Sequence, residues 1–185
     1  MKELAKILDA TASYRSIWRK KEPDRVLWID IEPEIELKPD ILMDCTNTDF
    51  EDGRFHTIFF DPPHSYNFTK NTGIHQTPSR KLQKEKWGNT GSYYGFERYK
   101  SKTELLRFID KAQLEFLRIL SDDGILWFKW GELRESVDNV LHIFDKWDIM
   151  MKMEVAYRGK VVGARTYWFA LMKKSQFNKD YDKND

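Results

Sequence analysis

Short apolar runs recur along the chain, and most of them end in an acidic residue or a turn signal. These runs span residues 7–9, 26–30, 41–44, 57–61 and 124–129. Near-continuous apolar runs of this length are typical of strands that are buried on both faces, as in a parallel sheet. Two later runs, 149–157 and 166–172, flank a turn at 158–160 and predict an antiparallel pair of strands.

Helical periodicity lies between some of these runs. Residues 103–120 show the strongest pattern, a broad apolar stripe on one side of a helix. Ser101 or Thr103 can cap this helix, and Glu104 favours its N-terminal end. A second helix is predicted over 132–146, and two helical turns are predicted over 14–21.

The alternation of strands and helices predicts an α/β fold with a mostly parallel sheet and a C-terminal antiparallel strand pair. The connections 31–40 and 45–54 have about ten residues each, close to the lower limit for a parallel crossover. We therefore expect short loops there and a sheet that is partly bare on one side. A single domain is expected over 1–174, followed by a polar tail at 175–185.

Composition narrows the functional classes. The chain has 185 residues, 41% hydrophobic and 15% aromatic, which is enough apolar material for the core of one domain. Its 31 Lys and Arg nearly balance its 30 Asp and Glu, so only the local distribution of charge is informative. Cys45 is the one cysteine, which excludes an intrachain disulfide framework and a thiolate metal cluster. Without a membrane-length apolar run or a secretory signal, the chain is expected to be cytoplasmic.

The strongest chemical signal is Asp61-Pro62-Pro63-His64, directly after a buried run. Two consecutive prolines make a stiff exit from the strand, because each fixes its own φ and restricts the residue before it. The Asp61 carboxylate and a carbonyl near Pro62 can then accept both protons of an exocyclic amine, which frees its lone pair for attack on a methyl group. His64 can stack on the ring that carries the amine. The alternative is a polar turn after a strand.

Three further acids, Asp9, Asp30 and Asp44, close earlier strands. In a parallel sheet the ligand crevice lies outside the carboxyl ends of the strands, so the four acids are expected at one rim. For each acid taken singly, a solvated strand end or a helix cap is the simpler interpretation. Four acids in the same position of successive strands favour a ligand site.

The chain resembles class I S-adenosylmethionine-dependent methyltransferases over residues 7–18, 26–32, 39–44 and 55–64. More narrowly, it is similar to small phage and archaeal enzymes that methylate the amino groups of adenine or cytosine, and residues 124–130 share this likeness. The resemblance covers about residues 7–172, apart from a long insertion. It implies a Rossmann-like methyltransferase fold. Where the family usually has glycine in its first loop, this chain has Ala12 and Ser13.

The resemblance also implies which residues do what. S-adenosylmethionine is the expected cofactor. The strand-end positions then suggest Asp30, or alternatively Glu32, for the ribose, Asp44 for the adenine amino group, and Asp9 beside the amino-acid part. The complete expected cofactor site is Asp9, Ala10, Thr11, Ser13, Asp30, Ile31, Asp44 and Cys45. Asp61, Pro62, Pro63 and His64 form the expected catalytic site, and no metal is required.

The insertion at 64–102 carries eight Lys or Arg against two Glu, with seven aromatic residues interleaved. Basic side chains neutralise phosphates and aromatic faces stack on unpaired bases, which indicates a nucleic-acid substrate. The expected substrate-binding residues are Tyr66, Arg80, Lys81, Lys84, Tyr93, Tyr94 and Arg98. The alternative is a loop whose aromatic side chains fold back into a small core of their own.

These patterns together predict methylation of an exocyclic amine, cytosine N4 or adenine N6, in nucleic acid. An insertion of about 40 residues is too short to recognise a long duplex site, so RNA such as rRNA is favoured over DNA. Two other classes stay open. One is a non-catalytic nucleic-acid-binding module with a degenerate cofactor site, and the other is an N-methyltransferase of proteins or small molecules.

Overall fold

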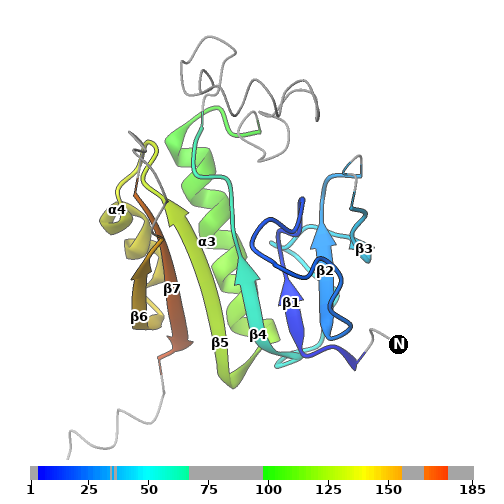
Figure 1. The fold of residues 1–185 in the computed structure, drawn as a ribbon. Helices are drawn as coiled ribbons and strands as arrows, with labels where there is room; N and C mark the ends of the chain where they lie inside the picture. Colours follow the sequence, from blue (N-terminus) through cyan, green and yellow to red (C-terminus); the bar gives the residue numbers. More distant parts are fainter. Residues whose placement is uncertain (1–3, 34, 36, 67–97, 156–164, 175–185) are drawn as a thin grey trace, which may run out of the picture.

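The computed structural model describes residues 4–33, 35, 37–66, 98–155 and 165–174 (Figure 1). The strands are β1 (Ile7–Asp9), β2 (Val26–Asp30), β3 (Ile41–Leu42), β4 (Phe55–Phe60), β5 (Leu120–Gly131), β6 (Trp147–Glu154) and β7 (Thr166–Lys173). The helices are α3 (Lys102–Ile119), α4 (Val137–Leu141) and the 3₁₀ helix η2 (His142–Phe144). All seven strands expected from the apolar runs are present, with ends that differ by a few residues.

The strands form one sheet in the order β3-β2-β1-β4-β5-β7-β6 (Figure 1). The pairs from β3 to β5 are parallel, whereas β7 is antiparallel to both β5 and β6. The predicted α/β fold with a mostly parallel sheet and a C-terminal antiparallel pair is therefore confirmed. Strand order reverses between β1 and β4, which is where open α/β sheets place their ligand crevice.

One face of the sheet packs against helices. Ser101 caps α3 by accepting a hydrogen bond from the Glu104 amide, and the helix buries Leu105, Ile109 and Phe116. These side chains meet alternate residues of the strands, including Ile58 and Phe60 of β4 and Leu126 and Phe128 of β5. The alternation has a period of two because successive strand residues point to opposite faces.

The other face is covered only in part. Trp18, Trp28 and Ala12 form a small second cluster over β1 and β2. Among the described residues no helix packs on this face, and the connections 31–40 and 45–54 contain no helix. The expectation of a partly bare sheet is confirmed. Two expected helices are corrected: 14–21 forms turns without a helix, and 132–146 is helical only in α4 and η2.

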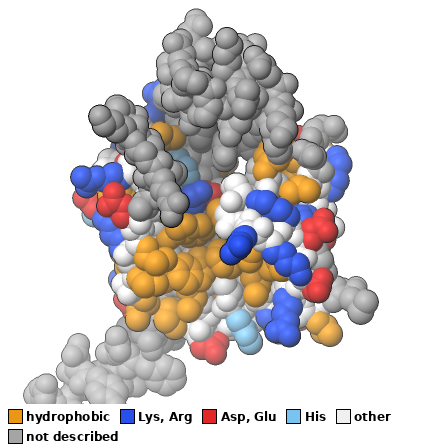
Figure 2. Space-filling view, viewed as in Figure 1, with side chains coloured by type: hydrophobic (Ala, Val, Ile, Leu, Met, Phe, Trp, Pro, Cys, Tyr) orange, Lys and Arg blue, Asp and Glu red, His pale blue; other side chains and the backbone are white. Residues whose placement is uncertain are grey.

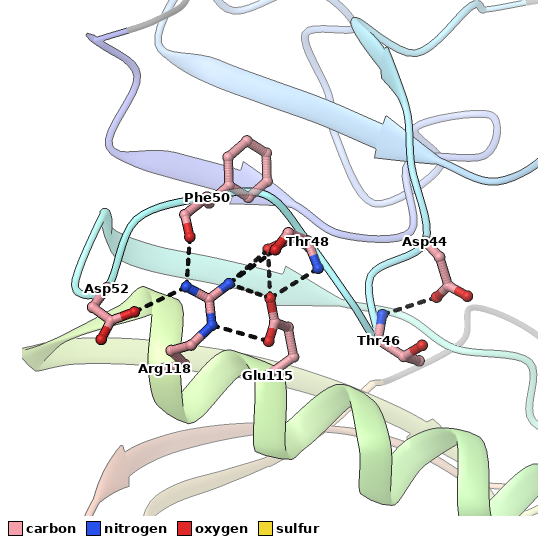
Figure 3. Close-up of polar contacts among 7 residues, drawn as sticks. All are labelled: Asp44, Thr46, Thr48, Phe50, Asp52, Glu115 and Arg118. Atoms are coloured by element: carbon pink, nitrogen blue, oxygen red, sulfur yellow. Dashed lines mark hydrogen bonds and ion pairs between the residues drawn. The ribbon is translucent and has the colours of Figure 1, made fainter.

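A charged network replaces the missing crossover helix before β4 (Figure 3). Arg118 of α3 donates to the carbonyls of Phe50 and Thr48 at 2.6 and 3.0 Å, and to the Asp52 carboxylate at 2.9 Å. Glu115, one turn earlier, accepts from the Thr48 amide and hydroxyl at 2.9 and 2.6 Å. One Arg–Glu pair thereby fixes the whole β3–β4 connection against α3, which sets the position of β4 and of the segment after it.

Candidate functional site

A cavity of about 430 Å³ opens at the carboxyl ends of β1, β2, β3 and β4. Its volume lies within the usual range for sites of small ligands. All eight residues expected at the cofactor site line it: Asp9, Ala10, Thr11, Ser13, Asp30, Ile31, Asp44 and Cys45. Asp61 and Pro63 line the same cavity, together with Arg107, Phe108 and Lys111 of α3. The structure thus brings the strand-end acids and the segment after β4 to one place.

Asp61 follows β4 and is held from two sides. The Lys129 ammonium, on the neighbouring strand β5, lies 2.7 Å from Oδ2, and His64 Nε2 lies 3.1 Å from Oδ1. Burial alone would raise the pKa of Asp61, but the hydrogen bond from His64 and the positive charge of Lys129 bring this pKa below its usual value. Asp61 is therefore an ionised acceptor whose side chain is 12% exposed, and each of its oxygens keeps a second lone pair.

The backbone at Asp61 is fixed by the loop after β1. The Asp61 amide donates to Thr11 Oγ1 at 2.9 Å, and the Ala10 amide donates to the Phe59 carbonyl at 2.9 Å. Pro62 and Pro63 follow without amide protons of their own. The first loop and the double proline are thus locked together across the point where strand order reverses.

Asp9 lies at the end of β1 and is almost completely buried. Its carboxylate accepts from Trp18 Nε1 at 2.7 Å and from the Thr11 amide at 3.2 Å. Burial raises the pKa of Asp9 to about 7, more than these two neutral donors lower it, and the nearby charges of Asp61 and Asp30 add to the rise. A carboxyl in this state ionises readily when a positive charge comes close.

Asp30 and Asp44 organise the backbone on the other side of the cavity. Asp30 accepts from the Ser13 amide at 2.8 Å and from the Glu32 amide at 2.9 Å. Asp44 is exposed and accepts from the Thr46 amide at 2.9 Å (Figure 3). Both carboxylates keep lone pairs that can accept further hydrogen bonds from a ligand in the cavity.

Two residues of the first loop have the left-handed backbone that glycine adopts without strain. Ser13 has φ of 42° and Arg15 has φ of 51°. The sequence has no glycine there, so the loop takes the conformation at an energetic cost. The Arg15 guanidinium stacks over Trp28 at 4.3 Å and donates to the carbonyls of Lys21 and Lys38 at 2.8 Å each, which holds the segment in place.

Cys45 is buried beside the cavity, and burial raises the pKa of its thiol. The thiol therefore stays protonated, and Cys45 contributes to the cavity wall as a small buried residue. The His64 ring packs edge-on against Trp130 at 5.2 Å and lies over Gly131, where an added Cβ would meet it at 3.3 Å. In this arrangement His64 faces Asp61, and stacking on a base stays a prediction.

Two of the expected substrate-binding residues lie within the described chain. Arg98 lines the cavity, whereas Tyr66 lies outside it and donates to Glu135 at 2.9 Å. Glu135 also accepts from Lys102 at 2.6 Å, so the start of α3 and the residues after the double proline are fastened to one carboxylate. Arg80, Lys81, Lys84, Tyr93 and Tyr94 lie outside the described residues.

Sequence reasoning missed Lys129. The available signal was its place at the end of an apolar run, in a strand expected to be buried on both faces. Within the ranges described above, no group of three His, Cys, Asp or Glu side chains could hold a metal ion. None of the described helices is long and apolar enough to cross a membrane.

Comparison with known proteins identifies the fold. No protein-family model matches the chain, and neither does any curated protein. Among solved structures, the PH0226 protein from Pyrococcus horikoshii OT3 is 12% identical, covers 91% of this chain and 81% of its own, and has a TM-score of 0.54. The N-methyltransferase NodS from Bradyrhizobium japonicum WM9 is 12% identical, with 91% and 84% covered and a TM-score of 0.51.

A SAM-dependent methyltransferase from Leishmania major is also 12% identical, with 89% of this chain and 63% of its own covered and a TM-score of 0.51. At this level of identity the likeness shows a shared fold. The chain therefore has the Rossmann-like α/β fold of these structures, two of which are methyltransferases, as its sequence predicted.

Proposed function

We propose that this protein transfers a methyl group from S-adenosylmethionine to an exocyclic amine of a nucleic-acid base. The observation that carries the proposal is one cavity that joins the loop after β1 to an ionised carboxylate placed before two prolines. The methyltransferase fold of the compared structures supports the same cofactor.

The side chains of the cavity fit S-adenosylmethionine. The cofactor has an amino group, a ribose diol and an adenine amine, and each is a hydrogen-bond donor that suits a carboxylate. Asp9 would hold the amino group. The raised pKa of Asp9 shows that its ionised form has no positive partner among the described residues, and the charged amino group would stabilise that form. Asp30 would accept from the ribose and Asp44 from the adenine amine, since both line the cavity at the ends of the next strands.

Asp61 supplies the chemistry on the substrate side. A base amine is a poor nucleophile because its lone pair is delocalised into the ring. Hydrogen bonds from that amine to the Asp61 carboxylate and to the Pro62 carbonyl localise the lone pair on nitrogen. When bound, S-adenosylmethionine would supply a methyl group on a positively charged sulfur; as the nitrogen took that methyl group, the sulfur would keep the bonding electrons and become a neutral thioether. The nitrogen gains the methyl group and then loses a proton, which Asp61 can accept.

Lys129 keeps Asp61 in the state that this step needs. Its ammonium at 2.7 Å favours the ionised carboxylate and fixes the direction in which the free lone pairs point. The contact between His64 and the other oxygen at 3.1 Å restricts rotation of the carboxylate in the same way. Both residues act on the amine through Asp61, so they are positioning residues in this proposal.

The substrate we favour is an unpaired base in RNA, such as rRNA, because the insertion at 64–102 is basic and aromatic but short. The test is incubation of the purified protein with methyl-deuterated S-adenosylmethionine and with RNA or DNA, followed by mass spectrometry of the nucleosides. The expected product is a deuterated N6-methyladenosine or N4-methylcytidine in RNA. The same label in deoxynucleosides only would replace RNA by DNA, and labelled carbon or oxygen positions would contradict the amine chemistry.

A further inference from the structure

The face of the sheet that lacks helices carries a cluster of large aromatic side chains. Phe59 of β4 stacks with Trp127 of β5 at 6.3 Å and meets Trp168 of β7 edge-on at 6.2 Å. We call these three residues the aromatic face. All three are half-buried, and none belongs to the core beneath the helices. Figure 2 looks on to this side of the sheet and shows a broad hydrophobic area over β5, β6 and β7.

The aromatic face leads directly to Asp61 and Lys129. Side chains two residues apart on a strand share a face and are about 7 Å apart, so Trp127 precedes Lys129 on the same side of β5. Asp61 follows β4 two positions after Phe59, and its carboxylate lies 2.7 Å from the Lys129 ammonium. Trp168 is the register partner of Lys129, and the Lys129 ammonium lies 5.9 Å from its ring. A polymeric substrate with one residue bound at Asp61 would therefore have its neighbouring residues next to the aromatic rings on β4 and β5.

Basic residues border the aromatic face on the side of β1 and β2. Trp18 packs on Phe59 at 4.8 Å, and the residues that follow it are Arg19, Lys20 and Lys21, all exposed. Arg25, four positions further, is exposed as well, and two acids, Glu22 and Asp24, lie among these four basic residues. Figure 2 shows Lys and Arg side chains beside the hydrophobic area.

We propose that the aromatic face binds the single-stranded nucleic acid next to the target base. Bases would stack on Phe59, Trp127 and Trp168, and phosphates would lie along the basic segment 19–25. Rings beside exposed positive charges suit a single strand, because its bases stack and its phosphates are neutralised. Exposed Met151 and Met153, which pair with Ala170 and Trp168, widen the apolar area. This inference rests on the proposed function and adds a second surface to it.

The test measures the affinity for a fluorescein-labelled single-stranded RNA of twelve nucleotides by anisotropy at several salt concentrations. Trp127→Leu keeps an apolar side chain but removes the stacking surface, and we expect at least about a fivefold loss of affinity. Trp127→Phe keeps a ring and is expected to retain most of the affinity. Thermal unfolding of both variants establishes that a loss is not due to misfolding.

The electrostatic half of the proposal uses a matched pair of double variants. Arg19→Glu with Lys20→Glu reverses two charges beside the aromatic face, and we expect about a tenfold loss and a salt slope shallower by up to about 1.4. Lys146→Glu with Lys174→Glu reverses two exposed charges at the other end of the sheet, where the Lys174 amide bonds the Lys146 carbonyl. This control is expected to change affinity less than about twofold.

Three results would overturn the proposal. Unchanged RNA affinity in both Trp127→Leu and the Arg19–Lys20 variant would exclude the face even if methyl transfer to nucleic acid is observed. Equal losses of RNA affinity in the two charge-reversal variants would show that RNA is attracted by the overall charge of the protein and not by a defined surface. A dimer in sedimentation velocity that Trp127→Leu converts to a monomer would assign the face to a second copy of the chain. Conversely, the protein could bind RNA through the aromatic face and yet show no methyl transfer. That result would support this inference and contradict the proposed function.

Discussion

The ends of β1 and β4 lie side by side at the point where strand order reverses, and each brings a carboxylate to the same cavity. Asp9, the last residue of β1, accepts from neutral donors, and its pKa is raised to about 7. Asp61, after β4, has Lys129 and His64, and its pKa is lowered. Desolvation raises the pKa of both carboxyls, and at Asp61 the hydrogen bond from His64 and the charge of Lys129 reverse the direction of the shift. The cavity therefore holds one carboxylate whose ionised form is stabilised and one that responds to an arriving positive charge.

Removal of the carboxylate after β4 should have the largest effect. Asp61→Asn keeps the size of the side chain but places a donor where the amine needs an acceptor, and we expect kcat to fall about 10²–10⁴-fold. Affinity for S-adenosylmethionine, measured by calorimetry, should change less than about threefold. Asp122→Asn, a fully exposed site on β5, is the matched control. Turnover retained in Asp61→Asn would refute its role.

Removal of the positive charge next to Asp61 should shift the pKa of Asp61 upward, in the direction found for Asp9. In Lys129→Met the pKa of Asp61 should rise, because burial is no longer opposed by the ammonium. We expect kcat to fall about 10–100-fold at pH 6 and by less at pH 8, since the protonated form cannot accept from the amine. Lys129→Arg should restore part of the rate at low pH. An unchanged pH profile of kcat in Lys129→Met would show that Lys129 does not control the ionisation of Asp61.

Asp9 should make cofactor binding depend on pH. If its carboxylate must ionise to hold the positively charged amino group of S-adenosylmethionine, a pKa of about 7 gives about fourfold tighter binding at pH 8 than at pH 6, because the amino group itself loses part of its charge near pH 8. Asp9→Asn should bind more weakly and lose this dependence in calorimetric titrations. A wild-type affinity that is flat over this range would place the amino group elsewhere.

The same group should also make stability depend on pH. The pKa of Asp9 is higher in the folded state than in the unfolded chain, so the unfolded state gains stability as it ionises first. The contribution of Asp9 to folding stability should therefore be lost as pH rises from about 4 to about 7, by up to about 4 kcal/mol. Urea unfolding of wild type and Asp9→Asn measures this difference, which should level off above pH 7. An equal pH dependence in the two proteins would contradict it.

The smallest effect concerns the backbone of the first loop. Ser13→Gly should stabilise the fold by about 0.5–1 kcal/mol, because glycine adopts a φ of 42° without the steric cost of a side chain. Ser16→Gly, an exposed site in the same loop where no positive φ is found, should be neutral or destabilising. A stabilisation of the same size in both variants would show that the gain does not come from relief of strain at Ser13.

The convergence of the strand-end acids was predictable because parallel strands end at one edge. Asp9, Asp30 and Asp61 directly end or follow strands that the apolar runs locate, so the topology alone brings them together. The same reasoning located α3, whose stripe and cap are local features. The sheet was expected to be partly bare because two connections of about ten residues are close to the lower limit for a parallel crossover and were expected to form short loops or a single turn.

Other features depend on contacts between distant residues. The pairing of Lys129 with Asp61 joins positions 68 residues apart, and the place of Lys129 at the end of an apolar run does not indicate which carboxylate it pairs with. Residues 14–21 have helical spacing, but Arg15 stacked on Trp28 holds the segment in turns. The helix expected from residue 132 begins at Val137, because Ser136 caps it and Glu132 accepts from the Val137 amide.

The most direct test of the central claim is a calorimetric titration of the protein with S-adenosylmethionine at pH 8. We predict one site per chain, at least tenfold weaker in Asp30→Ala and nearly unchanged in Asp61→Asn. This pattern would place the ribose beside β2 and leave Asp61 for the substrate. No heat at millimolar cofactor would contradict the account and favour a binding module that has the fold without the reaction.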